Sequence, residues 1–275
     1  MFKLLAPLML ASLMLAGCHS TSHEPTLTAQ QKQDRKKARS LFEARLSYAL
    51  KQAADPANTQ GLSGGFNLLL TVNDKNEVIG CDTQPTKWVA PQPFPYNPRL
   101  AKQLMPICWT TVLPEIPAFF FDKNNPTQQV VAPVLVHPLF GMTAQNTALR
   151  AAKLEVQAQN DFMFKHLLAN QPVDSIGIAT LLLMTDSTGR VQECAANLSP
   201  HPWRPEAFKQ NAPWLGDLIK QCKQLNLNAM PGFSANPQGL TSVVKQVEYT
   251  PWKAGLKTTP VKCDPAQSQS CSRTD

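Results

Sequence analysis

Two stretches of the chain share the same order of hydrophobic and polar positions. Each begins with a long segment, residues 31–54 or 144–170, in which apolar residues recur at helical spacing. Each then alternates apolar and polar positions as a β-strand does, turns, and alternates again. A proline-rich stretch, a short helical pattern and a valine-rich strand follow. The pattern therefore predicts two consecutive α-β-β-α-β units.

Prolines, glycines and asparagines mark the ends of these elements. Asp55-Pro56 and Pro172 are expected to end the two long helices. Asn76 and Gly189 hold the same place in the two hairpin turns, and both residue types tolerate a left-handed backbone. The predicted strands are residues 66–72, 77–81, 129–136, 178–185, 190–194 and 242–249. Short helices are expected at residues 99–108 and 214–222, after loops at residues 82–98 and 195–213.

Specific residues repeat at a constant distance along the chain. Leu68-Leu69-Leu70 recurs as Leu181-Leu182-Leu183, and Cys81 recurs as Cys194, in both cases 113 positions further on. Core packing explains any single leucine, but the constant offset indicates an internal duplication. We therefore expect an α+β fold of two tandem units, residues 30–140 and 141–255, each a small antiparallel sheet packed on helices.

The N-terminus predicts export. A 13-residue apolar run, residues 4–16, follows Lys3 and is too short to span a bilayer, as in a signal peptide. Leu15-Ala16-Gly17-Cys18 resembles the bacterial lipobox, which implies a signal peptide at residues 1–17, a lipidated Cys18 and a linker at residues 18–29. His19, where aspartate would retain the anchor, favours the periplasmic side of the outer membrane. An ordinary cleaved signal with an unrelated cysteine is the alternative.

The cysteine count changes once the anchor is set aside. Seven cysteines less Cys18 leave six, and an oxidising compartment favours three disulfides. Pairing within each unit, and within the tail at residues 256–275, is the simplest of the possible arrangements. No Cys-x-x-Cys occurs and no histidine stands at ligand spacing to a cysteine pair, so we expect no metal or cofactor. The expected pairs are Cys81 with Cys108, Cys194 with Cys222, and Cys263 with Cys271.

The positive charge of the chain does not indicate nucleic acid. The formal net charge is +7, and the basic residues are dispersed apart from a run at residues 32–39. An exported lipoprotein has no contact with nucleic acid. The run at residues 32–39 is either a solvated helix face or a segment attracted to anionic lipid or peptidoglycan.

The order of the elements and several of their residues resemble the C-terminal domains of the TonB and TolA proteins. The resemblance implies a sheet whose final strand is an open edge that accepts an extended peptide. The Ser-Ser-Gly that often follows the family's second strand is absent, and a lipid anchor does not couple to an inner-membrane motor, so active energy transduction is not expected. The matching segments are residues 72–78 and 185–191 (strand, turn, strand), Leu113-Pro114-Glu115-Ile116-Pro117 (helix exit), and residues 130–136 and 243–249 (last strand).

The last strand of the second unit is the candidate binding edge. Pro133 interrupts the first copy of this strand, whereas Gln246 stands at that place in the second and keeps its N–H. Trp88 and Trp203 follow the second strand of each unit, either as packing residues or as a recognition surface. The candidate edge consists of Val243, Val244, Lys245, Gln246, Val247, Glu248 and Tyr249.

The sequence favours binding over catalysis. Gly61-Leu62-Ser63-Gly64-Gly65 has the Gly-x-Ser-x-Gly spacing, but it precedes a strand, whereas a nucleophile elbow follows one. No pair of carboxylates and no Ser/His/Asp set stands at matching places in both units. We therefore expect a non-catalytic, lipid-anchored module that binds an envelope protein, with no small-molecule substrate. The alternatives are a spacer or subunit of a secretion, pilus or envelope assembly, and a cell-wall-acting enzyme.

Overall fold

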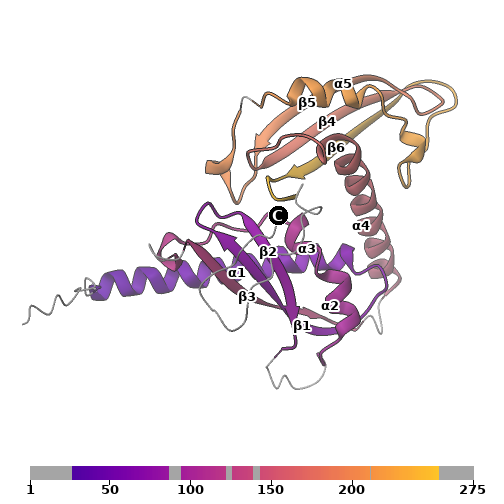
Figure 1. The fold of residues 1–275 in the computed structure, drawn as a ribbon. Helices are drawn as coiled ribbons and strands as arrows, with labels where there is room; N and C mark the ends of the chain where they lie inside the picture. The colour runs from indigo at the N-terminus through magenta and orange to yellow at the C-terminus, as the bar shows by residue number, and fades with distance from the viewer. Residues whose placement is uncertain (1–26, 87–93, 122–125, 139–142, 211, 254–275) are drawn as a thin grey trace, which may run out of the picture.

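The computed structural model describes residues 27–86, 94–121, 126–138, 143–210 and 212–253 (Figure 1). The first half contains α1 (Ala29–Ala57), β1 (Gly64–Asn73), β2 (Val78–Gln84), α2 (Pro98–Leu104), α3 (Ile107–Thr110), the 3-10 turn η1 (Ala118–Phe120) and β3 (Thr127–Val136). The second contains α4 (Ala144–Met163), the π-turn η2 (Phe164–Leu168), β4 (Gly177–Thr185), β5 (Val191–Pro200), η3 (Pro205–Ala207), α5 (Leu215–Cys222), η4 (Leu227–Ala229) and β6 (Thr241–Tyr249).

Each half builds one antiparallel three-stranded sheet with its first strand in the centre. The strand orders are β2-β1-β3 and β5-β4-β6. The registers correspond as well, because Leu69 lies opposite Val131 and Leu182 lies opposite Val244. The α+β class is therefore confirmed, and β3 and β6 are edge strands. Asn76 and Gly189 both take positive φ values, 60° and 76°, as the hairpin turns require.

One face of each sheet forms a core with the helices. Leu68 and Leu70 in β1, like Leu181 and Leu183 in β4, are at most 1% exposed. In the second half α4, η2 and α5 supply the apolar side chains that cover this face. The other face of each sheet keeps exposed apolar residues, among them Val244, which is 60% exposed. Period-2 patterning thus gives the edge strands β3 and β6 one covered and one open side, whereas the central strand β1 is buried along almost its whole length.

The first long helix does not end where the sequence predicts. Asp55-Pro56 lies inside α1, which continues to Ala57. Proline removes one backbone donor, but Leu50 and Ala54 are buried beside it and hold the last turns in place. Asn58 then caps the helix by donating its backbone N–H to the Ala54 carbonyl at 2.9 Å. Burial of the helix face therefore overrides the proline signal.

Two other boundaries also differ from the prediction. The single helix expected at residues 99–108 is divided into α2 and α3, because Pro106 has no N–H to continue the ladder. Strand β5 runs on to Pro200 through residues expected to form a loop. Pairing with β4 extends along this whole segment, to Pro200 opposite Gly177, so cross-strand contacts outweigh the weak strand propensity of its alanines and asparagine.

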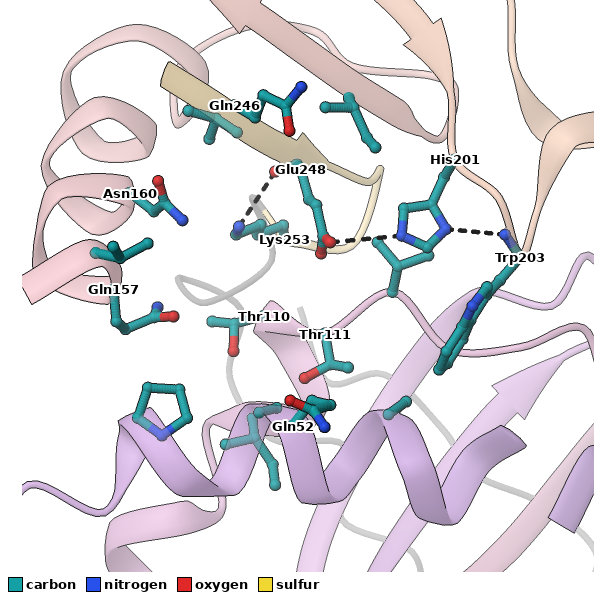
Figure 2. A pocket seen from close by; sticks show the side chains of 18 of the residues that line it. Gln52, Thr110, Thr111, Gln157, Asn160, His201, Trp203, Gln246, Glu248 and Lys253 are labelled. Carbon is teal, nitrogen blue, oxygen red and sulfur yellow. Dashed lines mark hydrogen bonds and ion pairs between the residues drawn. The ribbon is translucent and has the colours of Figure 1, made fainter. Parts of the chain in front are cut away.

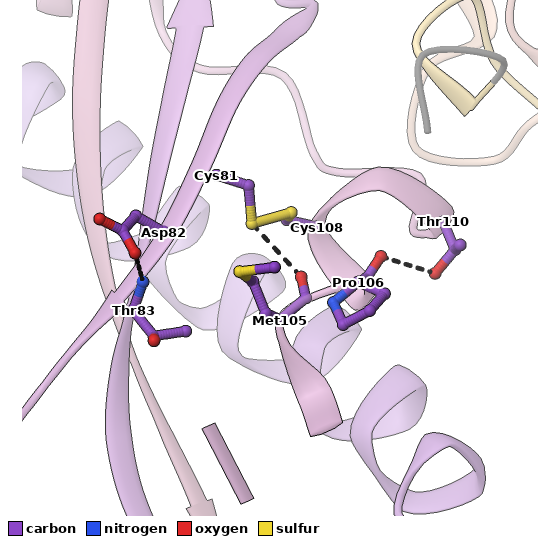
Figure 3. Close-up of a disulfide and its surroundings, with 7 residues drawn as sticks. All are labelled: Cys81, Asp82, Thr83, Met105, Pro106, Cys108 and Thr110. Carbon is purple, nitrogen blue, oxygen red and sulfur yellow. Dashed lines mark hydrogen bonds between the residues drawn. A yellow bond between two sulfur atoms is a disulfide. The ribbon is translucent and has the colours of Figure 1, made fainter. Parts of the chain in front are cut away.

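Two of the three expected disulfides lie within the described residues, and both are confirmed. Cys81 in β2 is bonded to Cys108 in α3, and Cys194 in β5 is bonded to Cys222 in α5. Figure 3 shows the first bridge, with the Cys81 Sγ lying 3.3 Å from the Met105 carbonyl oxygen. Each bridge therefore ties the outer strand of a sheet to the short helix that packs on it.

Other predicted features lie outside the described residues. These are the signal peptide at residues 1–17, the lipidated Cys18, and the pair Cys263 and Cys271 in the tail, all of which stay predictions. Across the ranges that the structure does describe, no helix combines the length and the apolar character needed to cross a membrane.

Replacing Cys194 and Cys222 together by alanine should lower the free energy of unfolding by about 2–4 kcal/mol, because the unfolded chain gains freedom. Urea unfolding followed by circular dichroism measures the change. Reductant should lower the free energy of unfolding of the parent protein. It should leave the stability of the second unit in the double variant unchanged. An unchanged unfolding midpoint in the double variant would show that the bridge contributes no stability.

Candidate functional site

A buried arginine joins the two halves of the molecule. Arg204 lies after β5, and its Nη1 donates to the Asn76 carbonyl oxygen in the first hairpin turn at 3.1 Å. The residue is 6% exposed. Burial lowers the pKa of the Arg204 guanidinium, and the nearby carboxylates of Glu115 and Glu77 partly offset this effect. The guanidinium stays protonated near neutral pH, so it provides a charged, desolvated link between the halves.

Further contacts position α4 on the end of α1. Lys153 forms an ion pair with Asp55 at 2.7 Å, and Arg150 donates to the Asn58 carbonyl. Apolar residues of the second half, Ile176 and Trp252, are buried in the core of the first. The halves are thus joined by packing as well as by polar contacts.

A cleft of ≈ 770 Å³ remains between the two halves (Figure 2). This volume falls within the range of about 300–1,000 Å³ that is usual for ligand sites. The end of α1 and the segment around α3 form the wall from the first half, and α4, the loop after β5 and strand β6 form the wall from the second. Its polar and aromatic lining includes Tyr48, Gln52, Thr110, Thr111, Gln157, Asn160, His201, Trp203, Gln246, Glu248 and Lys253.

The free edge of β6 opens into this cleft. The Glu248 carbonyl accepts a hydrogen bond from Lys253 Nζ at 3.2 Å, so this carbonyl points away from β4. Backbone groups alternate in direction along an antiparallel edge strand, so those of Gln246 and Val244 point to the same side. Val244 and Gln246 line the cleft, and no strand among the described residues pairs with them there. Their backbone donors and acceptors are open to a ligand.

The two edge strands differ at one equivalent position. Pro133 lies opposite Asn67, and Gln246 lies opposite Thr180. The backbone nitrogen of Pro133 points away from β1, so the proline costs the first sheet no hydrogen bond between β1 and β3. The same proline removes an outward donor from β3. Of these two equivalent strands, β6 therefore offers the uninterrupted edge.

A histidine and a carboxylate pair where β6 ends. His201 Nδ1 accepts the backbone N–H of Trp203 at 3.2 Å, and His201 Nε2 lies 3.4 Å from Glu248 Oε1. Partial burial raises the pKa of Glu248, but the hydrogen bond from His201 and the charges of His201 and Lys253 lower it more. The net pKa of Glu248 lies below its ordinary value of 4.5. Glu248 is therefore an anion near neutral pH.

Lys253 closes the C-terminal end of the open edge. Its ammonium lies 4.5 Å from the centre of the Phe164 ring and donates to the Glu248 carbonyl. Burial lowers the pKa of Lys253, while the charges of Glu248 and Asp161 raise it. Lysines are a common protection of sheet edges, and this one occupies the last outward carbonyl.

Several polar groups in the cleft are not used by the fold. The Thr111 Oγ1 is buried and has no hydrogen-bond partner in the described part of the chain. The side chains of Gln52, Asn160 and Gln246 make no hydrogen bond to another described residue. A buried polar group without a partner is costly, so a ligand that bonds to the Thr111 hydroxyl would gain affinity, and the more exposed amides are free to bond to the same ligand.

Two aromatic residues lie at the cleft, one from each half. Tyr48 in α1 is 58% exposed, and its ring centre lies 6.0 Å from that of Trp203. Trp203 thus packs across the halves and lines the cleft, and its role in recognition stays a prediction. Trp88, its expected counterpart, lies outside the described residues.

The structure divides the candidate binding edge by side-chain direction. Tyr249 and Val247 are buried in the second core, and Val243 packs against it. Val244, Gln246 and Glu248 are exposed on the open side. The sequence did not indicate the opposite wall, which comes from α1 and the segment around α3, nor the contribution of α4 beside β6, because polar residues on a helix look like an ordinary solvated face.

Replacing Glu248 by glutamine should flatten the pH dependence of stability. A lowered pKa means that the ionised Glu248 stabilises the fold above about pH 4.5 and that this contribution disappears as the pH falls through the folded-state pKa. The parent's unfolding free energy should therefore decrease more steeply than the variant's between about pH 5 and 3. Urea titrations across this interval measure the slopes. Glu193→Gln, an exposed carboxylate on β5, is the control and should keep the parental slope.

Comparison with known proteins identifies no relative: no family model, no curated protein and no solved structure matches this chain. Within the ranges that the structure covers, no group of three or more His, Cys, Asp or Glu side chains could hold a metal ion. The geometry of the cleft and of the β6 edge is therefore the basis for any functional conclusion.

Proposed function

We propose that the protein is a non-catalytic, lipid-anchored binding module of the bacterial envelope that holds an extended segment of an envelope partner along β6. The observation that carries this proposal is the open backbone edge of Val244, Gln246 and Glu248, which borders a cleft of ligand size. An extended peptide would add a fourth strand to the second sheet. Each main-chain hydrogen bond gained in this way contributes about 0.5–1.5 kcal/mol.

The cleft also offers side-chain contacts to such a peptide. A docked strand would lie about 4.8 Å from β6 and would direct alternate side chains to opposite sides. Tyr48 and Trp203 supply aromatic surface in the cleft lining. Gln157 and Asn160 on α4 supply amides, and Figure 2 shows them toward the other end of β6 from Trp203. We infer a partner segment that carries both apolar and polar residues.

The proposed location rests on the sequence. Leu15-Ala16-Gly17-Cys18 supports a lipid anchor, and His19 supports the outer membrane with the protein facing the periplasm. Strand addition is also what the resemblance to the TonB and TolA C-terminal domains implies, and the two sheets with matching strand order agree with that resemblance. The two disulfides suit an oxidising compartment.

Replacing Gln246 by proline should strongly weaken partner binding. The change removes an outward N–H from β6, and Pro133 shows that the equivalent backbone position accepts proline. Changing Pro133 itself to glutamine should have little effect. Pull-down from detergent-solubilised membranes, with the native anchor on the bait, identifies the partner and measures the bound amount.

Gln246→Ala provides the matched control, because it shortens the side chain and keeps the backbone donor. The alanine variant should bind nearly as well as the parent, whereas the proline variant should not. Circular dichroism of all three variants checks that the second sheet persists. Equal binding by the Gln246→Pro and Pro133→Gln variants would contradict strand addition at β6.

A rigid spacer or assembly subunit is the second candidate, favoured by the buried contacts of Arg204 and Trp252 between the halves. In that case the units would pack edge to edge, and β6 would have no free edge even in the isolated protein. Hydrogen exchange of residues 243–249 in the isolated protein separates the two proposals. Fast exchange of the Val244 and Gln246 amides is expected for a free edge, and strong protection of both would favour the spacer.

A further inference from the structure

The first turns of α1 extend beyond the core of the molecule. The buried positions of α1 begin at Phe42, and nearly all of residues 29–41 are exposed. Figure 1 shows this part of the helix projecting from the first sheet. A capping box stabilises its start: the Thr28 hydroxyl accepts the Gln31 N–H, and the Gln31 side chain accepts the Thr28 N–H. The helix is thus formed here without a core to pack on.

The stripe of α1 that faces the core becomes cationic where the helix projects. Leu46 and Phe42 are buried on this stripe. The same spacing of three and four residues continues through Arg39, Arg35 and Lys32. Basic side chains therefore stand where apolar ones would be expected if another part of this fold covered the helix.

Two phenylalanines of η1 lie beside this cationic stripe. Arg35 lies over the ring of Phe119 at 5.3 Å, and Arg39 lies over the ring of Phe120 at 5.0 Å. Phe120 also contacts Phe42, with ring centres 5.9 Å apart, which ties η1 to the core. Phe119, Phe120 and Phe121 are all only half-buried. Aromatic and basic groups thus share one surface.

The remaining lysines of the projection are not neutralised by the fold. Lys32, Lys36 and Lys37 are exposed and form no ion pair with a described residue. Asp34, the one acidic residue in the run of residues 32–39, accepts a hydrogen bond from Gln30 instead. This surface therefore carries an excess of positive charge.

We propose that this surface, made of Lys32, Arg35, Lys36 and Arg39 of α1 with Phe119 and Phe120, lies against an anionic bilayer. Lysine and arginine side chains bind acidic lipid headgroups, and half-exposed aromatic rings suit the membrane interface. An acidic protein would satisfy the charge alone, whereas a bilayer satisfies the charge and the aromatic rings together.

The distance to the proposed anchor agrees with this placement. Ten residues lie between Cys18 and Ala29, the first residue of α1, and eleven steps of at most ~3.6 Å each give roughly 40 Å. This argument rests on the lipid anchor of the proposed function. The start of α1 is then held within reach of the bilayer, and a second, electrostatic contact would orient the cleft relative to it.

Partitioning into two kinds of vesicle tests the proposal. The full chain with its native anchor is mixed with vesicles of phosphatidylcholine alone or of phosphatidylcholine with phosphatidylglycerol, and the bound fraction is measured by flotation. The parent should prefer the anionic vesicles, and 1 M salt should remove the preference. Removing three charges of this surface, as Lys32→Gln, Arg35→Gln and Lys36→Gln, should reduce the preference by about fivefold per charge.

A second triple variant removes the same charge elsewhere. Lys51→Gln, Lys102→Gln and Lys223→Gln change exposed lysines away from the projection and should retain the parental preference. Equal preferences in the two triple variants would overturn the proposal, as would a parent that binds both vesicles equally. A missing lipid anchor gives a different result: weak binding to pure phosphatidylcholine, with the preference for anionic vesicles still measurable.

Discussion

The burial of Arg204 between the two halves is the constraint on which the site depends. Its guanidinium reaches the carbonyl of Asn76, the residue that takes the left-handed conformation in the first hairpin turn. A buried cation needs such partners, because desolvation without them is costly. With Trp252 and Ile176 buried in the first core, this contact fixes how the second sheet faces α1. The cleft is the space that this arrangement leaves unfilled.

Duplication accounts for the likeness of the two sheets, and single substitutions account for the differences between their open edges. The cross-strand pairs Leu69 with Val131 and Leu182 with Val244 are equivalent, and each leaves an apolar patch on the open side. Only the second patch lies at the cleft. Pro133 protects the β3 edge from pairing, as prolines do on exposed strands. Lys253 shortens the free edge of β6 by occupying the carbonyl of Glu248 at its C-terminal end. The copies are therefore specialised by their surroundings rather than by their cores.

The two proposed surfaces would act together at the envelope. The projecting part of α1 is cationic and lies on the N-terminal side of the chain, close to the proposed anchor, whereas β6 and its cleft belong mainly to the second half. A bilayer contact at one end and a peptide contact at the other are compatible, because they use different residues. The packed contacts between α1 and α4 would transmit the orientation of the helix to the cleft.

The sequence by itself determined the secondary structure of both units, their duplication and two disulfide pairs, because periodicity, turn residues and cysteine spacing are local or repeated signals. It missed the continuation of α1 through Pro56 and the length of β5, where burial and cross-strand pairing outweigh local preference. It singled out β6 as an edge by resemblance, but not the wall opposite. Only the tertiary structure brought Tyr48, Gln52 and Asn160 to that edge. Their positions depend on how the halves pack, and no sequence pattern within either half predicts the packing between them.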